Sequence, residues 1–209
     1  FLNNVQKVLD EGDFVSTYKF ALLMALADLS IELGDDSGDE LIIEVTQIGE
    51  KFIQYYWGQS APFPSLNDGS EVLFQNTGRQ AAVVSKIQSY NSQSFVAFKR
   101  SGSDWERLLN GVTLQVRSMP LWRLQKVGGT VVDFLYSHGG DSRTITLKPG
   151  IVFCFRRFHG LIKNLVQGTW AKWVGSLSKN RSVIGGEVDL QSFLFGCDRG
   201  SLSSYKAFL

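Results

Sequence analysis

The chain has 209 residues, of which 44% are hydrophobic and 12% aromatic, and its formal net charge at pH 7 is +1. This composition supports a buried core and excludes a disordered chain, and no apolar run reaches the roughly 20 residues that span a bilayer. Two cysteines and two histidines do not supply the four closely spaced ligands of a structural zinc site. We therefore expect one helix-rich domain over residues 1–209, with reduced thiols, a cytoplasmic location and no membrane partner.

The charge is divided by position along the chain. Residues 1–98 hold five Lys and Arg against thirteen Asp and Glu, a net charge of −8, whereas residues 99–181 hold fourteen against four, a net charge of +10. Phosphate binding needs many cations on one surface, so this division indicates contact of the basic part with nucleic acid. Alternatively, the acidic and basic parts pack against each other and neutralise their charges. Residues 1–98 and 99–209 form a natural subdivision of the domain under either interpretation.

The acidic part predicts mostly helices. Its predicted elements are helices over 1–9, 16–33, 46–57 and 77–90, a strand over 41–45 and a loop over 58–70. The helix over 16–33 is apolar on nearly every side and is therefore expected in the core. Lys19 and Asp28 interrupt it, so each should pair elsewhere or reach the surface. The acidic segment 35–40 lacks the ligand spacing of a calcium loop and predicts a solvated turn.

The basic part predicts helices and a hairpin. Its predicted elements are helices over 103–117, 151–175 and 189–195, strands over 130–136 and 143–147, a loop over 176–188 and the start of a helix over 201–209. Ser103 and Glu106 have the spacing of a capping box. The two strands are expected to pair as an antiparallel hairpin. The fold class is therefore α+β, dominated by helices, with a small antiparallel hairpin or sheet.

The helix over 151–175 holds the most unusual side chains. Helical spacing puts one set on a common face: Arg156, His159 or Gly160, Lys163, Gln167 and Trp170. It puts the other set on the opposite face: Phe155, Phe158, Ile162, Leu165 and Thr169. A cationic stripe with an aromatic near its end is typical of a helix that follows phosphates. The alternatives are an ordinary solvated face, or an arginine pair that bridges to the acidic part.

The predicted phosphate contacts are Arg156, Arg157, Lys163 and Lys172, with Arg123, Lys99 and Arg100 widening the surface. Catalytic signals are weak. The chain has no phosphate-binding glycine loop, no nucleophile elbow and no strand-borne acid-x-Lys sequence of a metal-dependent nuclease core. His159 has no carboxylate nearby in sequence to orient it. We therefore predict no catalytic, metal-binding or cofactor-binding residue in this chain.

Three blocks of sequence carry a resemblance to a known family. They are residues 17–23 (Thr-Tyr-Lys-Phe-Ala-Leu-Leu) with Ala27-Asp28-Leu29, residues 147–162 with Gln167-Gly168-Thr169-Trp170, and Phe193-Leu194-Phe195-Gly196 with Arg199 and Leu202. In this order they resemble the N-terminal region of a group of bacterial HNH endonucleases. In that group a Tyr-Lys or His-Lys pair followed by a leucine-rich run begins the chain.

The resemblance implies that a nuclease cassette follows the third block. Such a cassette has a Cys-x-x-Cys zinc knuckle and a His-bearing strand for a divalent metal such as Mg²⁺. This chain stops at Leu209, where the cassette would begin, so its expected function is the nucleic-acid-binding or targeting region of an HNH endonuclease in restriction or phage defence. DNA or another nucleic acid would be its partner. The alternative is a protein-interaction module, for example a homodimerisation module, that does not touch nucleic acid.

Overall fold

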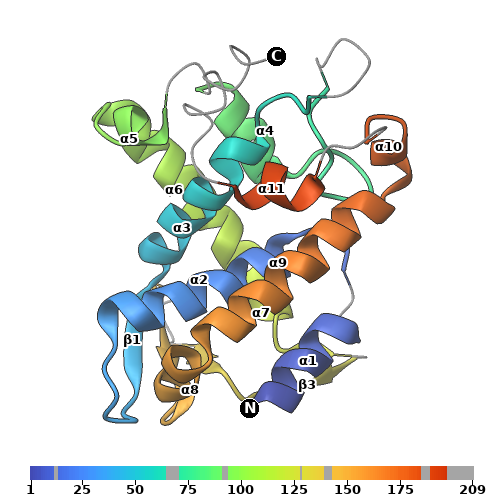
Figure 1. Cartoon of the computed structure of the whole chain (residues 1–209). Helices are drawn as coiled ribbons and strands as arrows, with labels where there is room; N and C mark the ends of the chain where they lie inside the picture. The colour runs from blue at the N-terminus through green and yellow to red at the C-terminus, as the bar shows by residue number, and fades with distance from the viewer. Residues whose placement is uncertain are drawn as a thin grey trace, which may run out of the picture.

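The computed structural model describes residues 1–11, 14–64, 71–90, 94–127, 129–138, 143–184 and 189–196. Its helices are α1 (Leu2–Asp10), α2 (Tyr18–Leu33), α3 (Val45–Gln59), α4 (Ala82–Gln88), α5 (Phe95–Phe98), α6 (Ser103–Ser118), α7 (Pro120–Arg123), α8 (Ile151–Arg157), α9 (His159–Ser176), α10 (Ser178–Arg181) and α11 (Leu190–Phe195). Its strands are β1 (Leu41–Glu44), β2 (Lys126–Val127), β3 (Thr130–Val131), β4 (Tyr136–His138) and β5 (Thr144–Leu147). The predicted helix-dominated α+β fold is confirmed (Figure 1).

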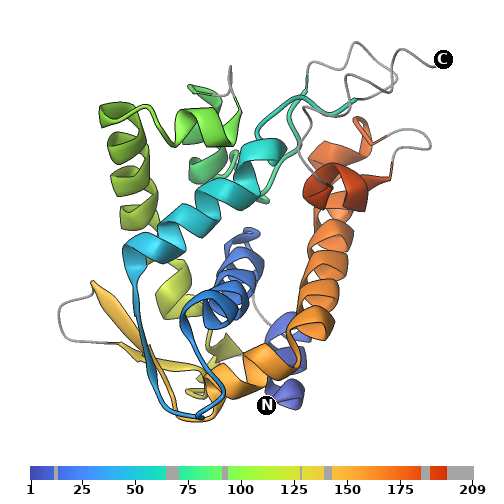
Figure 2. The ribbon, with the colours of Figure 1, turned by 60° about the vertical axis from the view of Figure 1, so that its left-hand side comes forward.

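Helix α2 lies at the centre of this fold. Twelve of its sixteen residues are buried, and α3, α7, α8 and α9 all contact it. Figure 2 shows α2 between α3 on one side and α8 with α9 on the other. A helix that is apolar on every side is stable only when neighbours cover every side. The surrounding elements come from both the acidic and the basic part, and the buried residues from Val5 to Leu194 form one hydrophobic cluster.

A three-stranded antiparallel sheet has the strand order β1-β5-β4. Leu147 of β5 is paired with Leu41 of β1 on one side and with Tyr136 of β4 on the other. The predicted hairpin is therefore confirmed as β4–β5, although the predicted link over 139–142 lies outside the described residues. The pairing of β1 with β5 joins the acidic part to the basic part.

The predicted strand over 130–136 is divided in two. Thr130 and Val131 pair with β2, and Tyr136 begins β4. The side chain of Gln125 explains the division, because its Oε1 accepts from the N–H of Leu135 at 2.7 Å and its Nε2 donates to the carbonyl of Tyr136 at 3.0 Å. A side chain thus satisfies backbone groups that a strand partner would otherwise satisfy.

The predicted helix over 151–175 is broken at Phe158 into α8 and α9, which meet at an angle in Figure 2. The break lets both pieces pack against α2. Phe158 still accepts a hydrogen bond from the N–H of Ile162 and donates to Cys154, so the helical phase is nearly retained. Side chains on the two sides of the break therefore keep nearly the helical spacing on which the predicted faces depend.

Other boundaries differ from the sequence prediction for local reasons. Helix α4 begins at Ala82 and not near residue 77, because the N–H of Thr77 donates to Val15 and holds this segment beside the chain before α2. Helix α6 begins at Ser103 as predicted, but Gly102 precedes it and no side-chain cap forms. A capping box forms instead at the start of α3, between Glu44 and Gln47.

The predicted loop over 176–188 contains the short helix α10, and its residues 185–188 lie outside the described residues. In the loop predicted over 58–70, the last residues of α3 are still helical and 65–70 are not described. The start of a helix predicted over 201–209 also lies outside the described part, as do Arg199 and Leu202 of the third block of resemblance.

The close packing of α3 on α6 gives the first prediction. A Cβ added at Gly49 of α3 would lie 2.6 Å from Oγ1 of Thr113 and 3.5 Å from Cδ1 of Leu109, both on α6. Gly49→Ala should therefore lower the free energy of unfolding by about 1–3 kcal/mol, because the two helices must separate. Chemical denaturation followed by circular dichroism measures this change.

Gly58 is the matched control in the same helix. A Cβ at Gly58 meets no atom within 4 Å, so Gly58→Ala should leave stability unchanged or raise it by up to about 1 kcal/mol through helix propensity. Equal effects of the two substitutions would contradict the described contact between α3 and α6.

Candidate nucleic-acid interface

The seven predicted phosphate contacts lie in three separate parts of the molecule. Lys99 and Arg100 follow α5 at one end, and Arg123 ends α7. The other four are on α8 and α9, and α8 lies at the end opposite α5 in both ribbon views (Figures 1 and 2). The predicted residues therefore do not share one continuous outer surface.

Two of these seven cations are engaged with the acidic part of the chain. Lys99 forms an ion pair with Glu50 of α3. Arg156 forms one with Asp36, its Nε lying 2.6 Å from Oδ1. Both pairs fit the alternative in which the basic and acidic parts pack against each other. Among the described residues, the structure gives no side-chain hydrogen bond or ion pair for the other five, which are Arg100, Arg123, Arg157, Lys163 and Lys172.

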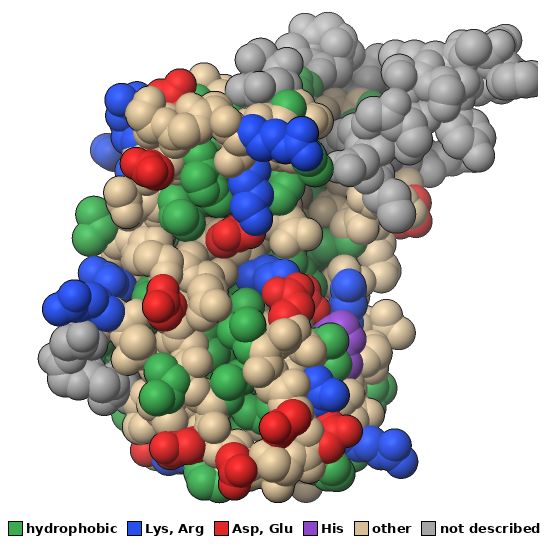
Figure 3. Space-filling view, turned by 90° about the vertical axis from the view of Figure 1, so that its left-hand side faces the viewer, with side chains coloured by type: hydrophobic (Ala, Val, Ile, Leu, Met, Phe, Trp, Pro, Cys, Tyr) green, Lys and Arg blue, Asp and Glu red, His purple; other side chains and the backbone are tan. Residues whose placement is uncertain are grey.

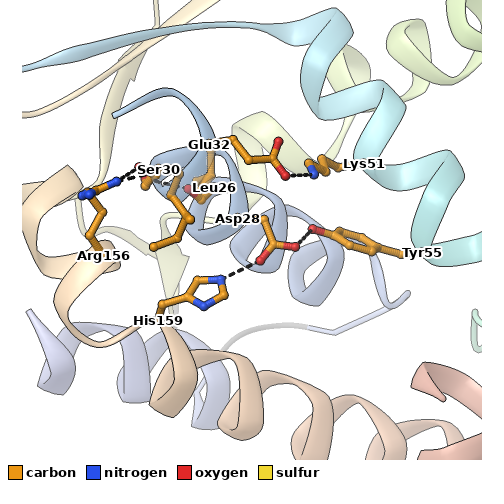
Figure 4. Close-up of polar contacts among 9 residues, drawn as sticks. Leu26, Asp28, Ser30, Glu32, Lys51, Tyr55, Arg156 and His159 are labelled. Carbon is orange, nitrogen blue, oxygen red and sulfur yellow. Dashed lines mark hydrogen bonds and ion pairs between the residues drawn. The ribbon is translucent and has the colours of Figure 1, made fainter. Parts of the chain in front are cut away.

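Arg156 also closes the end of α2. Its Nη1 donates to the carbonyls of Ile31 at 3.1 Å and Gly34 at 2.9 Å. A longer contact joins it to Ser30 at 3.4 Å, and Figure 4 shows Arg156 beside this residue. The last carbonyls of a helix have no partner within the helix, and a cation there also complements the negative end of the helix dipole. Arg156 therefore stabilises α2, and most of its donors are already used.

The face predicted to be cationic is half-buried, and its last residue turns into the core. Trp170, which was expected at the end of an outward stripe, is fully buried, and its Nε1 donates to Oε1 of Gln75 at 2.9 Å. The buried side of α9 consists of Ile162, Val166, Trp170 and Val174, spaced four residues apart. The predicted division of faces is wrong at this point, because burying the indole ring removes more apolar surface from water than burying Leu165 would.

His159, on the same predicted face, lies beside the carboxylate of Asp28. Asp28 of α2 accepts two hydrogen bonds through its carboxylate, from Nε2 of His159 at 2.7 Å and from the hydroxyl of Tyr55 at 2.7 Å (Figure 4). Burial and the Asp28 carboxylate raise the pKa of Tyr55 well above its ordinary value, so the phenol stays protonated and donates. Asp28 thus has partners elsewhere in the fold, as predicted, and it joins α2, α3 and α9.

His159 therefore has the orienting carboxylate that its neighbours in sequence do not supply. A carboxylate-oriented imidazole can act as a general base where a substrate reaches its second nitrogen. Nδ1 of His159 points away from Asp28 in Figure 4, and His159 is not among the residues that line the pocket between α2 and α7. We therefore treat the three side chains as a link between helices. In the sequence, the only sign of this link is an Asp inside an apolar helix. The partners of Asp28 lie 27 and 131 residues away, so the sequence does not identify them.

A pocket forms at the other end of α2, where this helix meets α7. The residues that line it are Val15, Ser16, Tyr18, Lys19, Met119, Pro120 and Arg123. Pro120 occupies the first turn of α7, a position that suits proline because no N–H is required there. Hydrogen bonds from the N–H of Thr17 to Gln75 and of Thr77 to Val15 hold the opposite wall. None of the described lining residues is acidic.

Two cations line this pocket. Lys19 is 6% exposed, and its ammonium donates to the carbonyl of Lys126 at 3.1 Å and lies 5.4 Å from the ring centroid of Phe14. Arg123 is exposed. Its neighbour in sequence, Trp122, is 62% exposed but does not line the pocket. The pocket thus combines a buried ammonium with an exposed guanidinium. Arg123 is one of the predicted phosphate contacts, and Lys19 was expected to pair elsewhere or reach the surface. No sequence pattern indicates that these two residues share a pocket.

Comparison with known proteins places this helix-dominated α+β chain in a family. A family model described as a domain of unknown function, DUF8808, matches residues 1–189. The chain therefore belongs to the DUF8808 family. No curated protein and no solved structure matches it. In the part of the chain that the structure describes, no group of three or more His, Cys, Asp or Glu could hold a metal ion, and no helix has the length and apolar character to cross a membrane.

The link through Asp28 gives the second prediction. Asp28→Ala should lower the free energy of unfolding by about 1–3 kcal/mol, because it leaves two half-buried donors without their acceptor. A double-mutant cycle with His159→Gln should give a coupling energy of about 0.5–3 kcal/mol, measured by chemical denaturation.

Asp10→Ala, at an exposed position that ends α1, is the control and should change stability by no more than about 0.5 kcal/mol. A coupling energy of zero between Asp28 and His159 would show that the hydrogen bond between them contributes nothing to the fold.

Proposed function

We propose that this chain is the nucleic-acid-binding or targeting region of a bacterial HNH endonuclease that acts in restriction or phage defence. In this proposal, metal-dependent phosphodiester cleavage takes place in a cassette outside residues 1–209. The resemblance of the three sequence blocks supports it, and the first two blocks lie against each other in the fold. The first block lies on α2 and the second on α8 and α9, both of which contact α2. Asp28 of the first block binds His159 of the second.

The single observation that carries the nucleic-acid contact is the pocket between α2 and α7. Arg123 presents a planar guanidinium that can donate two parallel hydrogen bonds to a phosphate. Lys19 lines the same pocket, where its ammonium donates to the carbonyl of Lys126. A guanidinium at a concave site favours an anion, and a phosphodiester supplies one at every nucleotide.

Trp122 on α7 and Lys126 on β2 lie close to Arg123 in sequence, and in this proposal they extend the site. Both side chains are exposed. A base that stacks on an exposed indole gains binding free energy whatever its identity, and this is how many proteins bind single strands. The arrangement therefore favours an unpaired nucleotide whose phosphate enters the pocket. In this proposal Arg123 is the central predicted contact, while Arg100, Arg157, Lys163 and Lys172 remain predictions for a wider surface.

The alternative function, a protein-interaction module that does not touch nucleic acid, has a specific observation in its favour. The ion pairs of Arg156 with Asp36 and of Lys99 with Glu50 neutralise part of the basic region within the chain. Nucleic-acid binding at low salt separates the two functions, because an internally neutralised surface would not attract a polyanion.

The third prediction measures this binding by fluorescence anisotropy with a labelled single-stranded oligonucleotide and its duplex. Affinity should fall steeply as the salt concentration rises from about 50 mM to about 200 mM, because each phosphate contact releases condensed counterions. Arg123→Gln should weaken binding and make the logarithmic salt slope shallower by about one. Trp122→Ala should weaken binding to the single strand by about 1–3 kcal/mol per stacked base and affect the duplex less.

Arg181→Gln is the matched control, since Arg181 is an exposed arginine on α10, apart from α7 (Figure 1). It should leave both the affinity and the salt slope close to those of the unmodified chain. No binding at low salt would contradict the nucleic-acid function. Strong binding that Arg123→Gln leaves unchanged would contradict only its assignment to the pocket.

A further inference from the structure

The outer side of α8 and α9 is apolar. Phe153, Phe158, Leu161 and Leu165 are 36–56% exposed. Phe153, Arg157, Leu161 and Leu165 are four residues apart, so they follow one side of the two helices, away from α2. We call the surface formed by Phe153, Arg157, Phe158, Leu161, Leu165 and Lys172 the basic apolar face. Large side chains grouped in this way on a surface mark a place where another molecule binds.

This face lies in a stretch that has no negative side chain. Residues 142–186 contain no Asp or Glu and eight Lys or Arg. Arg157 and Lys172 are exposed and form no ion pair with the described residues. An occupant of this face should therefore combine apolar side chains with carboxylates.

A second exposed surface of the same chain has that chemistry. Ile31 and Leu33 near the end of α2 and Ile42 of β1 are 42–62% exposed. The segment between them carries exposed carboxylates, of which those of Asp39 and Glu40 form no ion pair with the described residues. We call the surface formed by Ile31, Leu33, Asp39, Glu40 and Ile42 the acidic apolar face. Figure 3 shows acidic and hydrophobic side chains together in the lower part of this view.

The two faces are neighbours on the molecule. Arg156 in the last turn of α8 binds the carbonyl of Ile31 and the carboxylate of Asp36, so the end of α2 lies against α8. When two complementary surfaces lie side by side on one molecule, a two-fold axis that passes between them can bring each surface onto its complement in a second copy. The basic apolar face of each copy then covers the acidic apolar face of the other.

We infer that the chain forms a two-fold homodimer in which the basic apolar face of each copy packs on the acidic apolar face of the other. Two contacts form at once, each with apolar side chains at its centre and charges at its rim, as is usual for protein interfaces. The inference does not depend on the nucleic-acid proposal, because neither face includes a residue of the pocket between α2 and α7. It assigns to protein contact Arg157 and Lys172, which were also predicted for the wider nucleic-acid surface, so the two assignments compete at these two residues only.

The test uses charge reversal in pairs. The first variant carries Arg157→Glu and Lys172→Glu, and the second carries Asp39→Lys and Glu40→Lys. In each variant alone, like charges face each other in both contacts, so the dimer dissociation constant should rise by more than about 100-fold. In an equimolar mixture, opposite charges face each other in both contacts, so a heterodimer should form with an affinity close to that of the unmodified chain.

Sedimentation velocity over a concentration series measures these constants, with one variant labelled to identify the heterodimer. Leu161→Asp with Leu165→Asp should also give monomers, because it puts carboxylates in the apolar centre. Lys86→Glu with Arg181→Glu reverses two exposed cations elsewhere and should leave the dimer intact, and circular dichroism checks that every variant is folded.

Three results would overturn the inference. The first is an unmodified chain that stays monomeric at the highest concentration it reaches in solution. The second is a dimer that neither charge variant weakens, which would place its interface elsewhere. The third is a mixture of folded variants that remains monomeric, which would show that the two faces do not meet each other.

Discussion

The burial of α2 on all sides is the constraint on which the rest of the structure depends. A helix that displays apolar side chains in every direction cannot rest on a surface, so other elements have to surround it. The chain supplies them from both parts, with α3 on one side, α7 near its start, and α8 and α9 on the other side. The break at Phe158 follows from this requirement, because one straight helix would not lie against both the end and the length of α2.

This constraint also decides where the charges lie. The net charges of residues 1–98 and 99–181 suggested either a basic surface or an internal pairing of the two parts. Because both parts surround the same helix, some opposite charges come within reach of each other, and Arg156 with Asp36 and Lys99 with Glu50 form ion pairs. Such exposed pairs contribute little to stability. However, these pairs use two of the predicted cations, so fewer cations remain for a polyanion, and those that remain lie in separate parts of the surface.

The sequence predicted the local structure better than the arrangement of side chains across it. The helix over 16–33 and the strand over 143–147 follow from patterns of adjacent residues, and these were found with small shifts of boundary. The division at Gln125 and the partners of Asp28 depend on residues far away in sequence or on a single side chain. The orientation of Trp170 was also not predictable, since helical spacing fixes which residues share a face but not which face is buried. That choice depends on the volume that α2 and α3 leave unfilled.

Two of the charged residues of α2, Lys19 and Asp28, mark the places where the buried helix meets polar groups of other elements. Burying a charged group in an apolar helix costs free energy unless another group forms a hydrogen bond or ion pair with it. Its position therefore indicates where the surrounding elements supply polar atoms. Asp28 meets His159 and Tyr55, which tie three helices together. Lys19 meets the carbonyl of Lys126 and shares a pocket with Arg123. Both carry a charge, but Asp28 is negative and its carboxylate accepts from two donors within the fold, whereas Lys19 is positive and lines a pocket together with an exposed arginine. For this reason the pocket at the start of α2 is the candidate for binding an anion.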